Sequence, residues 1–539
     1  MASCSLDMLP ETDLTDNDFW KSETDLRGAC NRLYVDLKGF IMDTRSDEFI
    51  SPNQDLISSG NRSVPGTSSD WTDPYYNIGR CNNIIIKGAN APLTEKQKNK
   101  WLAEAYFFRA YNYFDLVKKY GDVPLILKVF DSTDDPEIKK ERTPRETVIQ
   151  QCYSDLEFAA NNLPDIDDIS DEVNWGRVSR SAALGLITRI GLYEGTYIKY
   201  HNLKDGDYKS HLKKSIDAAN TIINIEKKHD LYPDFQKLFY FEGEGRQNKE
   251  NIFVKVYGPN GAGTIVHSNS RNLSGSGTLS RQMLDNFLYI DGLPREKSQY
   301  KVTPEVKYSD IMDNRDPRLK MTIISVGEFG YNAIYRPFEF QSNGYGYPIK
   351  KGFMRSEWET SGKETVDKMI IRYAEVLISY AEALYEYNGS ISNEDLDKTI
   401  NYIRSRSGFN VKLSNEFVQK HGLDMLTEIR RERMVEFINE GLHYDDIIRW
   451  KTAEIVLPKA ILGLLYNEDE AAKNKDELGN RFTDENGYYK GVKLYDQGNI
   501  YIMEETETRS FNPERDYLYP IPSYEVSTSN NAIKQNPNW

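Results

Sequence analysis

Residues 101–124, WLAEAYFFRAYNYFDLVKKYGDVP, constrain the fold more than any other segment of the chain. Apolar side chains recur here at helical spacing along two stripes instead of one. The stripes consist of Leu102, Tyr106, Ala110, Tyr113 and Val117, and of Ala103, Phe107, Tyr111 and Phe114. A surface helix needs one apolar stripe, so two stripes predict a helix packed between neighbours, as in a stack of helical hairpins. Gly121 and Pro124 mark its end.

Signals for helix starts recur along the chain. Capping-box pairs precede several periodic segments, and Pro144 stands at a favoured first helical position. The pairs are Ser22–Asp25, Thr94–Gln97, Thr143–Glu146 and Ser392–Asp395. The predicted helices cover residues 22–38, 72–88, 94–120, 144–162, 178–200, 208–227, 367–388, 392–407 and 424–450. We therefore predict a mainly α fold, a tetratricopeptide-like helical-hairpin scaffold with long irregular loop regions and a few short strands.

Composition limits the partners that the chain can bind. Hydrophobic residues make up 39% and charged residues 28% of the 539 residues, which is typical of a folded globular protein. A formal net charge of -15 argues against nucleic acid or an anionic membrane surface as a partner. The 36 tyrosines are unusual, and a flat apolar ring with a polar tip suits contact surfaces that stay wet.

Motifs for metal or nucleophilic chemistry are missing from the sequence. The histidines at positions 201, 211, 229, 267, 421 and 443 are scattered, and none belongs to a zinc-type pair. The chain has neither a GxSxG elbow nor a phosphate loop that ends in Gly-Lys-Ser/Thr. We therefore expect no metal, no cofactor and no catalytic residue.

Paired carboxylates are the remaining signal for an enzyme. Glu375 and Glu382 lie two helical turns apart, which is about 10.5 Å along the axis at ~1.5 Å per residue. That separation exceeds the ~5–5.5 Å of a retaining glycosidase and the ~6.5–9.5 Å of an inverting one. The acidic residues of the segment 428–440 alternate with Arg431 and Arg433 and are explained by a salt-bridged helix face. A glycoside hydrolase with carboxylates on separate loops stays an alternative.

Glycine-rich loops with many aromatic residues favour a sugar-binding surface. A sugar ring presents a C–H face that stacks on aromatic rings, and hydroxyl groups that need planar polar partners. The candidate residues are Arg62, Asp70, Trp71, His267, Asn269, Arg271, Tyr331, Tyr335, Arg336, Tyr345 and Trp358. We expect more than half of the loop aromatics to be structural, with Trp71, Tyr335 and Tyr345 as the better ligand contacts.

The cysteines have two predicted roles. Cys4 precedes a polar stretch, as in a bacterial lipoprotein cut at its lipid-bearing cysteine, and an exposed terminal thiol is the alternative. Cys30, Cys81 and Cys152 lie in helical patterns and are predicted to be buried small hydrophobic residues. A disulfide among these three stays an alternative.

The pattern divides the chain into five regions. We predict a lipoprotein tether at 1–20, a first part of the helical scaffold at 21–230, a loop-rich glycan-binding insertion at 231–365, a second part of the scaffold at 366–450, and an irregular C-terminal region that packs on the scaffold at 451–539. Loops of this length in a compact protein are often functional.

Short motifs in a fixed order resemble the SusD/RagB family of surface glycan-binding lipoproteins of Bacteroidetes. The resemblance runs from Cys4 to Trp539. Its motifs are Ala103-Glu104, Arg109-Ala110-Tyr111, Gly121-Asp122-Val123-Pro124, Asp316-Pro317-Arg318-Leu319, Ile371-Arg372-Tyr373-Ala374-Glu375, residues 401–408 (NYIRSRSG), residues 429–450 (IRRERMVEFINEGLHYDDIIRW), Tyr519-Pro520-Ile521-Pro522 and Gln535-Asn536-Pro537. His443, where the family usually has Arg, departs from the pattern, as do Ser407 and Asn538-Trp539.

The resemblance implies both a location and a partner. It implies a protein of the cell outer membrane, anchored by a lipid at Cys4 and facing outside, that touches the membrane only through this anchor. It also implies an oligosaccharide or polysaccharide ligand, and delivery of that ligand to a SusC-like TonB-dependent outer-membrane transporter. The matched motifs belong to the scaffold and carry no ligand residues over. A protein-interaction scaffold without sugar binding stays an alternative.

Overall fold

The computed structural model describes residues 19–539 except 52, 131, 133, 134, 170–173, 260–263, 338–345, 361, 466 and 468–499. Cys4 and almost all of the predicted tether, together with Tyr345, therefore lie outside the described residues. No helix within the described part is long and apolar enough to cross a bilayer.

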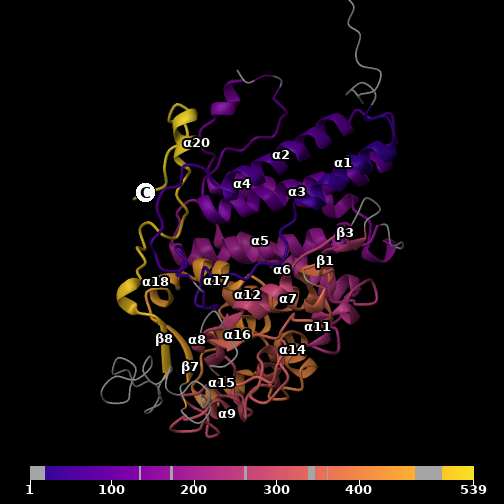
Figure 1. The fold of residues 1–539 in the computed structure, drawn as a ribbon. Helices are drawn as coiled ribbons and strands as arrows, with labels where there is room; N and C mark the ends of the chain where they lie inside the picture. Colours follow the sequence, from indigo (N-terminus) through magenta and orange to yellow (C-terminus); the bar gives the residue numbers. More distant parts are fainter. Residues whose placement is uncertain are drawn as a thin grey trace, which may run out of the picture.

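Antiparallel helices in layers form the largest part of the molecule. The scaffold helices are α1 (Glu23–Val35), α2 (Ser69–Gly88), α3 (Glu95–Tyr120), α4 (Arg145–Asn162), α5 (Arg180–His201), α6 (Tyr208–Asn220), α12 (Tyr373–Asn388) and α16 (Met425–Glu436). Consecutive helices pack together from α2 through α6, and α12 packs against α6, α5 and α16. Figure 1 shows this order from α1 and α2 at the top to α16 below. The predicted helical-hairpin scaffold is confirmed.

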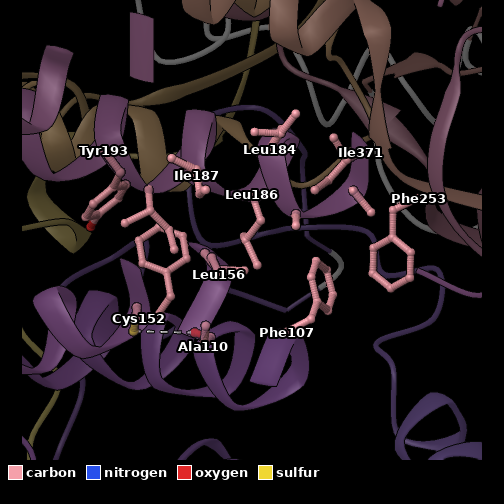
Figure 2. Close-up of a cluster of buried hydrophobic side chains, with 14 of the residues drawn as sticks. Phe107, Ala110, Cys152, Leu156, Leu184, Leu186, Ile187, Tyr193, Phe253 and Ile371 are labelled. Atoms are coloured by element: carbon pink, nitrogen blue, oxygen red, sulfur yellow. Dashed lines mark hydrogen bonds between the residues drawn. The ribbon is translucent and has the colours of Figure 1, made fainter. Parts of the chain in front are cut away.

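Helix α3 is covered on two sides, as its two apolar stripes predict. Helix α2 packs on one side of α3 and α4 on another. Figure 2 shows Ala110 of α3 beside Cys152 of α4, with Leu184 and Ile187 of α5 above both. The Cys152 thiol donates to the Ala110 carbonyl at 3.7 Å. Cys30, Cys81 and Cys152 are buried free thiols, so the prediction that they act as small hydrophobic residues is confirmed.

Glycines on α5 bring this helix close to α6. A Cβ atom at Gly191 would lie 2.6 Å from the His211 carbonyl oxygen, and one at Gly195 would lie 2.7 Å from Leu212 Cγ. Any larger residue would therefore force the two helices apart. The small residues of α5 thus allow its backbone to approach that of α6 closely.

Helix boundaries differ from the prediction in four places. The predicted capping boxes at Ser22 and Thr94 are present. The predicted capping box at Thr143 is absent, because α4 begins after Pro144 without a side-chain cap. The predicted helix 392–407 is broken at Thr399, which separates α13 (Asn393–Lys398) from α14 (Ile400–Arg406). The first residues of the predicted helix 367–388 form strand β6 (Lys368–Arg372) instead.

The fourth difference divides the predicted helix 424–450. Asn439 and Gly441, with φ values of 64° and 74°, separate α16 from α17 (His443–Arg449). These left-handed conformations end a right-handed helix. The turn brings α17 back against α5.

Strands are short and occur in pairs. The pairs are β1 (Asn251–Lys255) with β6, β2 (Gly258–Pro259) with β3 (Thr264–Ile265), β4 (Thr278–Leu279) with β5 (Tyr347–Pro348), and β7 (Ile461–Leu465) with β8 (Ile500–Glu504), all antiparallel. In the β1–β6 pair, Lys255 is opposite Lys368. This pair lies against α5.

Short helices surround a second hydrophobic core, which is separate from the core of the scaffold. These helices are α7 (Asn269–Ser276), α8 (Arg281–Asp285), α9 (Tyr308–Met312), α10 (Pro317–Thr322) and α11 (Arg355–Glu359). The short helices α15 (Asn415–His421), α18 (Ala453–Val456) and α20 (Ser523–Thr528) pack against the scaffold core instead. Short 3-10 helices occur at Pro136–Lys139, Ile166–Asp168, Lys237–Phe239, Phe241–Gly243 and Thr506–Thr508, and Thr221–Glu226 continues α6 as a π-helix. Buried tyrosines such as Tyr308, Tyr335 and Tyr347 fill this second core.

The C-terminal segment runs back along the scaffold. In Figure 1 it is the yellow trace that rises from β8 to α20, beside the layers of α2 to α5. The Tyr519 amide donates to the Lys119 carbonyl at 2.7 Å, and the Asn536 side chain donates to the carbonyls of Tyr120 and Tyr519 at 3.1 and 2.8 Å. These bonds close the end of α3.

Buried ion pairs replace the solvent-facing salt bridges that the charges of the segment 428–440 predict. Glu428 pairs with Arg431 at i+3 spacing, as predicted. All three glutamates are buried, and the partners of Glu432 and Glu436 come from distant elements. These partners are Arg318, Arg372, Arg404 and Arg406. Burial alone would raise the pKa of the Glu436 carboxyl, but the charges of the arginines lower it well below its usual value.

Candidate functional site

A cavity of about 500 Å³ lies between the segment 36–45, which is the first part of the connection from α1 to α2, and the scaffold. Its wall is completed by α2, α3, α17 and the start of β6. The volume falls within the ~300–1,000 Å³ of small-molecule sites in proteins. The cavity opens to solvent between two stretches of chain, because Asp36 and Ile41 on one side and Ser69 and Asp73 on the other are exposed lining residues.

Charges in the cavity are arranged in pairs on the last turns of α3. The Asp115 carboxylate lies 2.8 Å from the Lys38 ammonium and 3.1 Å from that of Lys119, which also pairs with Asp70. Lys118 pairs with Asp445 of α17. Burial alone would raise the pKa of the Asp115 carboxyl, but Lys119 and Lys38 lower it far below its usual value. Asp115 therefore stays ionised.

The Lys368 ammonium differs from the other lining cations. It donates to the Gly39 carbonyl at 2.6 Å, and no carboxylate partner occurs among the described residues. Burial, followed by the charges of Lys255 and Lys38, lowers the pKa of Lys368 to about 8. Lys368 is thus a cation in a wall where the other cations are neutralised.

An aromatic group adjoins the same wall. Phe40, which lines the cavity, has its ring centroid 4.5 Å from that of His267 and 5.9 Å from that of Tyr257. Tyr111, Tyr444 and Tyr519 also line the cavity. Rings and hydroxyl groups next to carboxylates and amides can contact both the C–H face and the hydroxyl groups of a sugar.

His267, Glu357 and Glu364 are the one group of three possible metal ligands among the described residues. Their potential ligand atoms already have protein partners. His267 Nε2 lies 2.9 Å from the Val366 carbonyl oxygen. The backbone N–H of Asn269 donates to His267 Nδ1 at 3.1 Å. Glu364 accepts backbone bonds at the start of α7, and Glu357 accepts bonds from the backbone of residues 365 and 366. The group thus fixes the start of α7 to the segment before β6.

Two of the predicted site residues line the cavity, and two others contact its lining residues. Asp70 and Asn269 line it, and His267 packs against the lining residue Phe40. The Asn269 side chain also donates to the Gly352 carbonyl at 3.0 Å, and the Asp70 side chain is 43% exposed. These residues come from two regions that are distant in the sequence.

Several predicted aromatic contacts are covered by protein. Trp71 is 3% exposed and packs on Tyr75 and Tyr120, with centroids 5.3 and 4.9 Å away. Tyr331 and Tyr335 are buried in the second core, where they contact aromatic rings of neighbouring elements. We predicted Trp71 and Tyr335 as ligand contacts, but in the structure their rings are buried and fill hydrophobic cores.

The other predicted residues that the structure describes are not lining residues of the cavity, although Arg62 packs on the lining residue Tyr519. The Arg62 guanidinium lies 4.7 Å from the Tyr519 ring and 5.2 Å from the Trp539 ring, and it donates to the Asp516 carbonyl at 2.7 Å. Arg271 covers the ring of half-buried Trp358 at 4.2 Å. Arg336 is exposed.

Sequence reasoning missed most of the cavity wall, including Lys38, Phe40, Lys118, Lys119 and Lys368. One signal for it was available. The end of α3 carries Asp115, Lys118 and Lys119 where both apolar stripes approach their end, and charges on a helix covered on two sides need a polar space to face. The contribution of β6 had no such signal.

Family models match most of the chain. A model described as "SusD family" matches residues 238–539, and one described as "Starch-binding associating with outer membrane" matches residues 41–192. "SusD-like protein P2" of Formosa agariphila is 24% identical over an alignment that covers 100% of this chain and 97% of the relative. A "SusD-like protein" of Bacteroides ovatus is 23% identical, with 97% and 93% covered.

Solved structures share the fold. A SusD-like carbohydrate binding protein from Bacteroides fragilis superposes with a TM-score of 0.76 at 23% identity, covering 96% of this chain and 99% of that one. A laminarin binding SusD-like protein gives a TM-score of 0.61 at 20% identity, covering 96% and 100%. At these identities the likeness concerns the fold alone.

Proposed function

Because the chain belongs to the SusD family, we propose that it is a non-catalytic, cell-surface glycan-binding protein whose cavity helps to hold an oligosaccharide. The names of the matched starch-binding family and of the laminarin-binding structure support a carbohydrate ligand. The observation that carries the proposal is the cavity between segment 36–45 and the scaffold, where aromatic rings and planar polar groups meet in an open space of about 500 Å³.

The ionisation of the lining carboxyls supports binding over hydrolysis. A glycosidase needs a carboxylic acid whose pKa is raised, so that it can protonate the leaving oxygen. Asp115 and Asp445 in the cavity are paired with lysines that lower their pKa, although burial alone would raise it. Burial raises the pKa of Glu48 and Glu244 to about 7, but these two carboxyls do not line the cavity.

The proposal includes delivery of the glycan. We propose that the protein is held at the outer membrane by a lipid on Cys4 and passes its ligand to a SusC-like TonB-dependent transporter for nutrient uptake. The matched family whose description mentions association with the outer membrane supports this location. Purification of the full chain from native membranes in detergent should recover a barrel protein of the TonB-dependent class. Recovery of that partner without glycan affinity would favour the protein-interaction alternative.

Isothermal titration against a panel of oligosaccharides tests glycan binding. We expect Phe40→Ala to weaken binding of the preferred glycan about fivefold, because loss of one stacking contact costs ~1 kcal/mol. Phe241→Ala is the matched control, since Phe241 is 41% exposed and lies outside the cavity lining. Absence of binding to every glycan, release of reducing ends, or equal affinity of Phe40→Ala and wild type would contradict the proposal.

A further inference from the structure

Lys368 is the lining cation without an acidic partner in the described part of the chain. The other cations of the wall each have one. Lys38 pairs with Asp115, Arg45 with Asp43, Lys118 with Asp445, Lys119 with Asp70 and Asp115, and Arg189 with Glu375. An ammonium carries three donors, and the Gly39 carbonyl takes one from Lys368. Two donors are therefore left for a ligand in the cavity.

The surroundings of Lys368 disfavour an isolated positive charge. Burial costs hydration, and the charges of Lys255, Lys38 and Arg189 repel the ammonium, with Glu440 as the opposing carboxylate. These effects lower the pKa of Lys368 to about 8. A negative group in the cavity would offset both the lost hydration and the repulsion.

A purely structural role explains part of this arrangement. The connecting segment 36–45 has carbonyl groups that need donors, and Lys368 supplies one at Gly39. Lys255, opposite Lys368 in the β1–β6 pair, does the same at Leu37 and Val35. Lys255, however, does not line the cavity. Tethering the segment therefore does not require a lysine that also faces the cavity.

The position of Lys368 suits a substituent on a bound sugar. Its Nζ atom lies 5.9 Å from the centroid of the Phe40 ring, and Phe40 lines the same cavity. A pyranose ring stacked on Phe40 would thus place an exocyclic group within reach of the ammonium. The net charge of -15 repels anions at long range, so recognition of an anionic sugar needs a local cation of this kind.

We propose that the cavity selects glycans with an anionic substituent, a uronate carboxylate or a sulfate ester, which binds the Lys368 ammonium beside Phe40. This inference rests on the proposed glycan-binding function and names the class of glycan. It assigns the two free donors of Lys368 to the anionic group and the face of Phe40 to the sugar ring.

Paired ligands on the full-length protein test the selection. Titrations compare a uronate oligosaccharide with its carboxyl-reduced form, and a sulfated oligosaccharide with its desulfated form. Wild type should bind at least one anionic member about tenfold more tightly than its neutral partner, as expected for one charge-assisted hydrogen bond. The two pairs distinguish the carboxylate from the sulfate. Equal affinities within both pairs would overturn the proposal.

Variants then assign the preference to Lys368. Lys368→Gln keeps a donor for the Gly39 carbonyl but removes the charge, and it should abolish the preference while binding of the neutral partner changes less than twofold. Lys368→Met is the second variant, and Lys255→Gln is the matched control that should keep the preference. A preference retained by both Lys368 variants, or lost in Lys255→Gln as well, would overturn the assignment.

Binding of neutral glycans without selection refutes this inference alone, whereas no binding of any glycan refutes the proposed function.

Discussion

Buried charges are the main surprise at the scale of single residues. Glu382 is buried and accepts both guanidinium bonds of Arg449 at 2.7 Å, together with one from the Trp450 indole at 2.6 Å. Burial alone would raise the pKa of the Glu382 carboxyl, but Arg449 lowers it to about 2. A single sequence hides such pairs, because Glu and Arg at helical spacing are typical of an exposed face.

Removal of Arg449 should strongly destabilise the protein. Arg449→Met leaves the Glu382 carboxylate buried without its main partner, and we expect a loss of ~3–5 kcal/mol in the free energy of unfolding. Urea unfolding followed by circular dichroism measures it. The control is Lys213→Met, which removes the exposed Lys213–Asp217 pair and should cost less than ~1 kcal/mol. Equal effects of the two variants would refute the structural role of the buried pair.

His443 gives the protein a pH-dependent stability. It lies 2.8 Å from the Asp47 carboxylate, with Glu48 and Asp446 as the other nearby acids. Burial alone would lower the pKa of the His443 imidazole, but Asp47 raises it to about 9. A raised pKa stabilises the fold fully below the ordinary value of 6.5, and this stabilisation is lost as the pH rises through 9.

We therefore expect the free energy of unfolding to fall by ~1–3 kcal/mol between pH 7 and pH 9. Burial raises the pKa of Glu48 to about 7, so about half of its titration falls inside this window and adds a smaller loss of the same sign. His443→Arg keeps the charge throughout and should flatten the curve. Denaturant unfolding at a series of pH values measures both proteins, and a wild-type curve as flat as that of the variant would contradict the role of His443.

At the scale of helices and strands, periodicity predicted the scaffold well and the boundaries less well. Two apolar stripes placed α3 correctly between neighbours, because a helix that is buried on two sides has apolar residues at helical spacing on both. Strand β6 was predicted as helix, since the short apolar run from Met369 to Ile371 fits either structure. The turn at Asn439 and Gly441 was missed because one polar residue and one glycine do not by themselves mark a helix end.

The contact between α5 and α6 should be sensitive to one methyl group. Gly191→Ala places a Cβ atom 2.6 Å from the His211 carbonyl oxygen, and we expect it to cost ~1–3 kcal/mol despite the better helix propensity of alanine. Gly79→Ala on α2 is the matched control, since no atom lies within 4 Å of its Cβ position. It should stabilise the protein by up to ~1 kcal/mol. Thermal unfolding of both variants checks the opposite signs.

At the scale of the whole molecule, the sequence predicted the fold class and few members of the candidate site. Asp70 and Asn269 were among the predicted residues because their side chains suit sugar hydroxyl groups. Trp71 and Tyr335 were predicted as ligand contacts because an aromatic residue in a glycine-rich loop gives no sign of whether its ring turns inward. The cavity wall combines stretches that are hundreds of residues apart, and periodicity does not report such distant contacts.

The C-terminal segment should stabilise the whole scaffold through Asn536. This side chain is 3% exposed, and Asn536→Ala leaves the Tyr519 carbonyl without its side-chain donor. The Tyr120 carbonyl keeps the Arg142 guanidinium as a donor, but Arg142 loses the Asn536 oxygen as an acceptor. We expect a loss of ~1–3 kcal/mol in the free energy of unfolding. Asn90→Ala removes an exposed bond to the Ile86 carbonyl and should cost less than ~0.5 kcal/mol. Differential scanning calorimetry of the two variants measures both losses. Equal small losses would contradict a stabilising role of the C-terminal segment.

The connecting segment 36–45 has one further consequence. It forms a wall of the cavity without belonging to any helical hairpin, and its carbonyl groups are held by lysines of β1 and β6. Under the proposed function, residues of this segment can change in evolution, and with them the bound glycan, while the helices that form the scaffold keep their sequence.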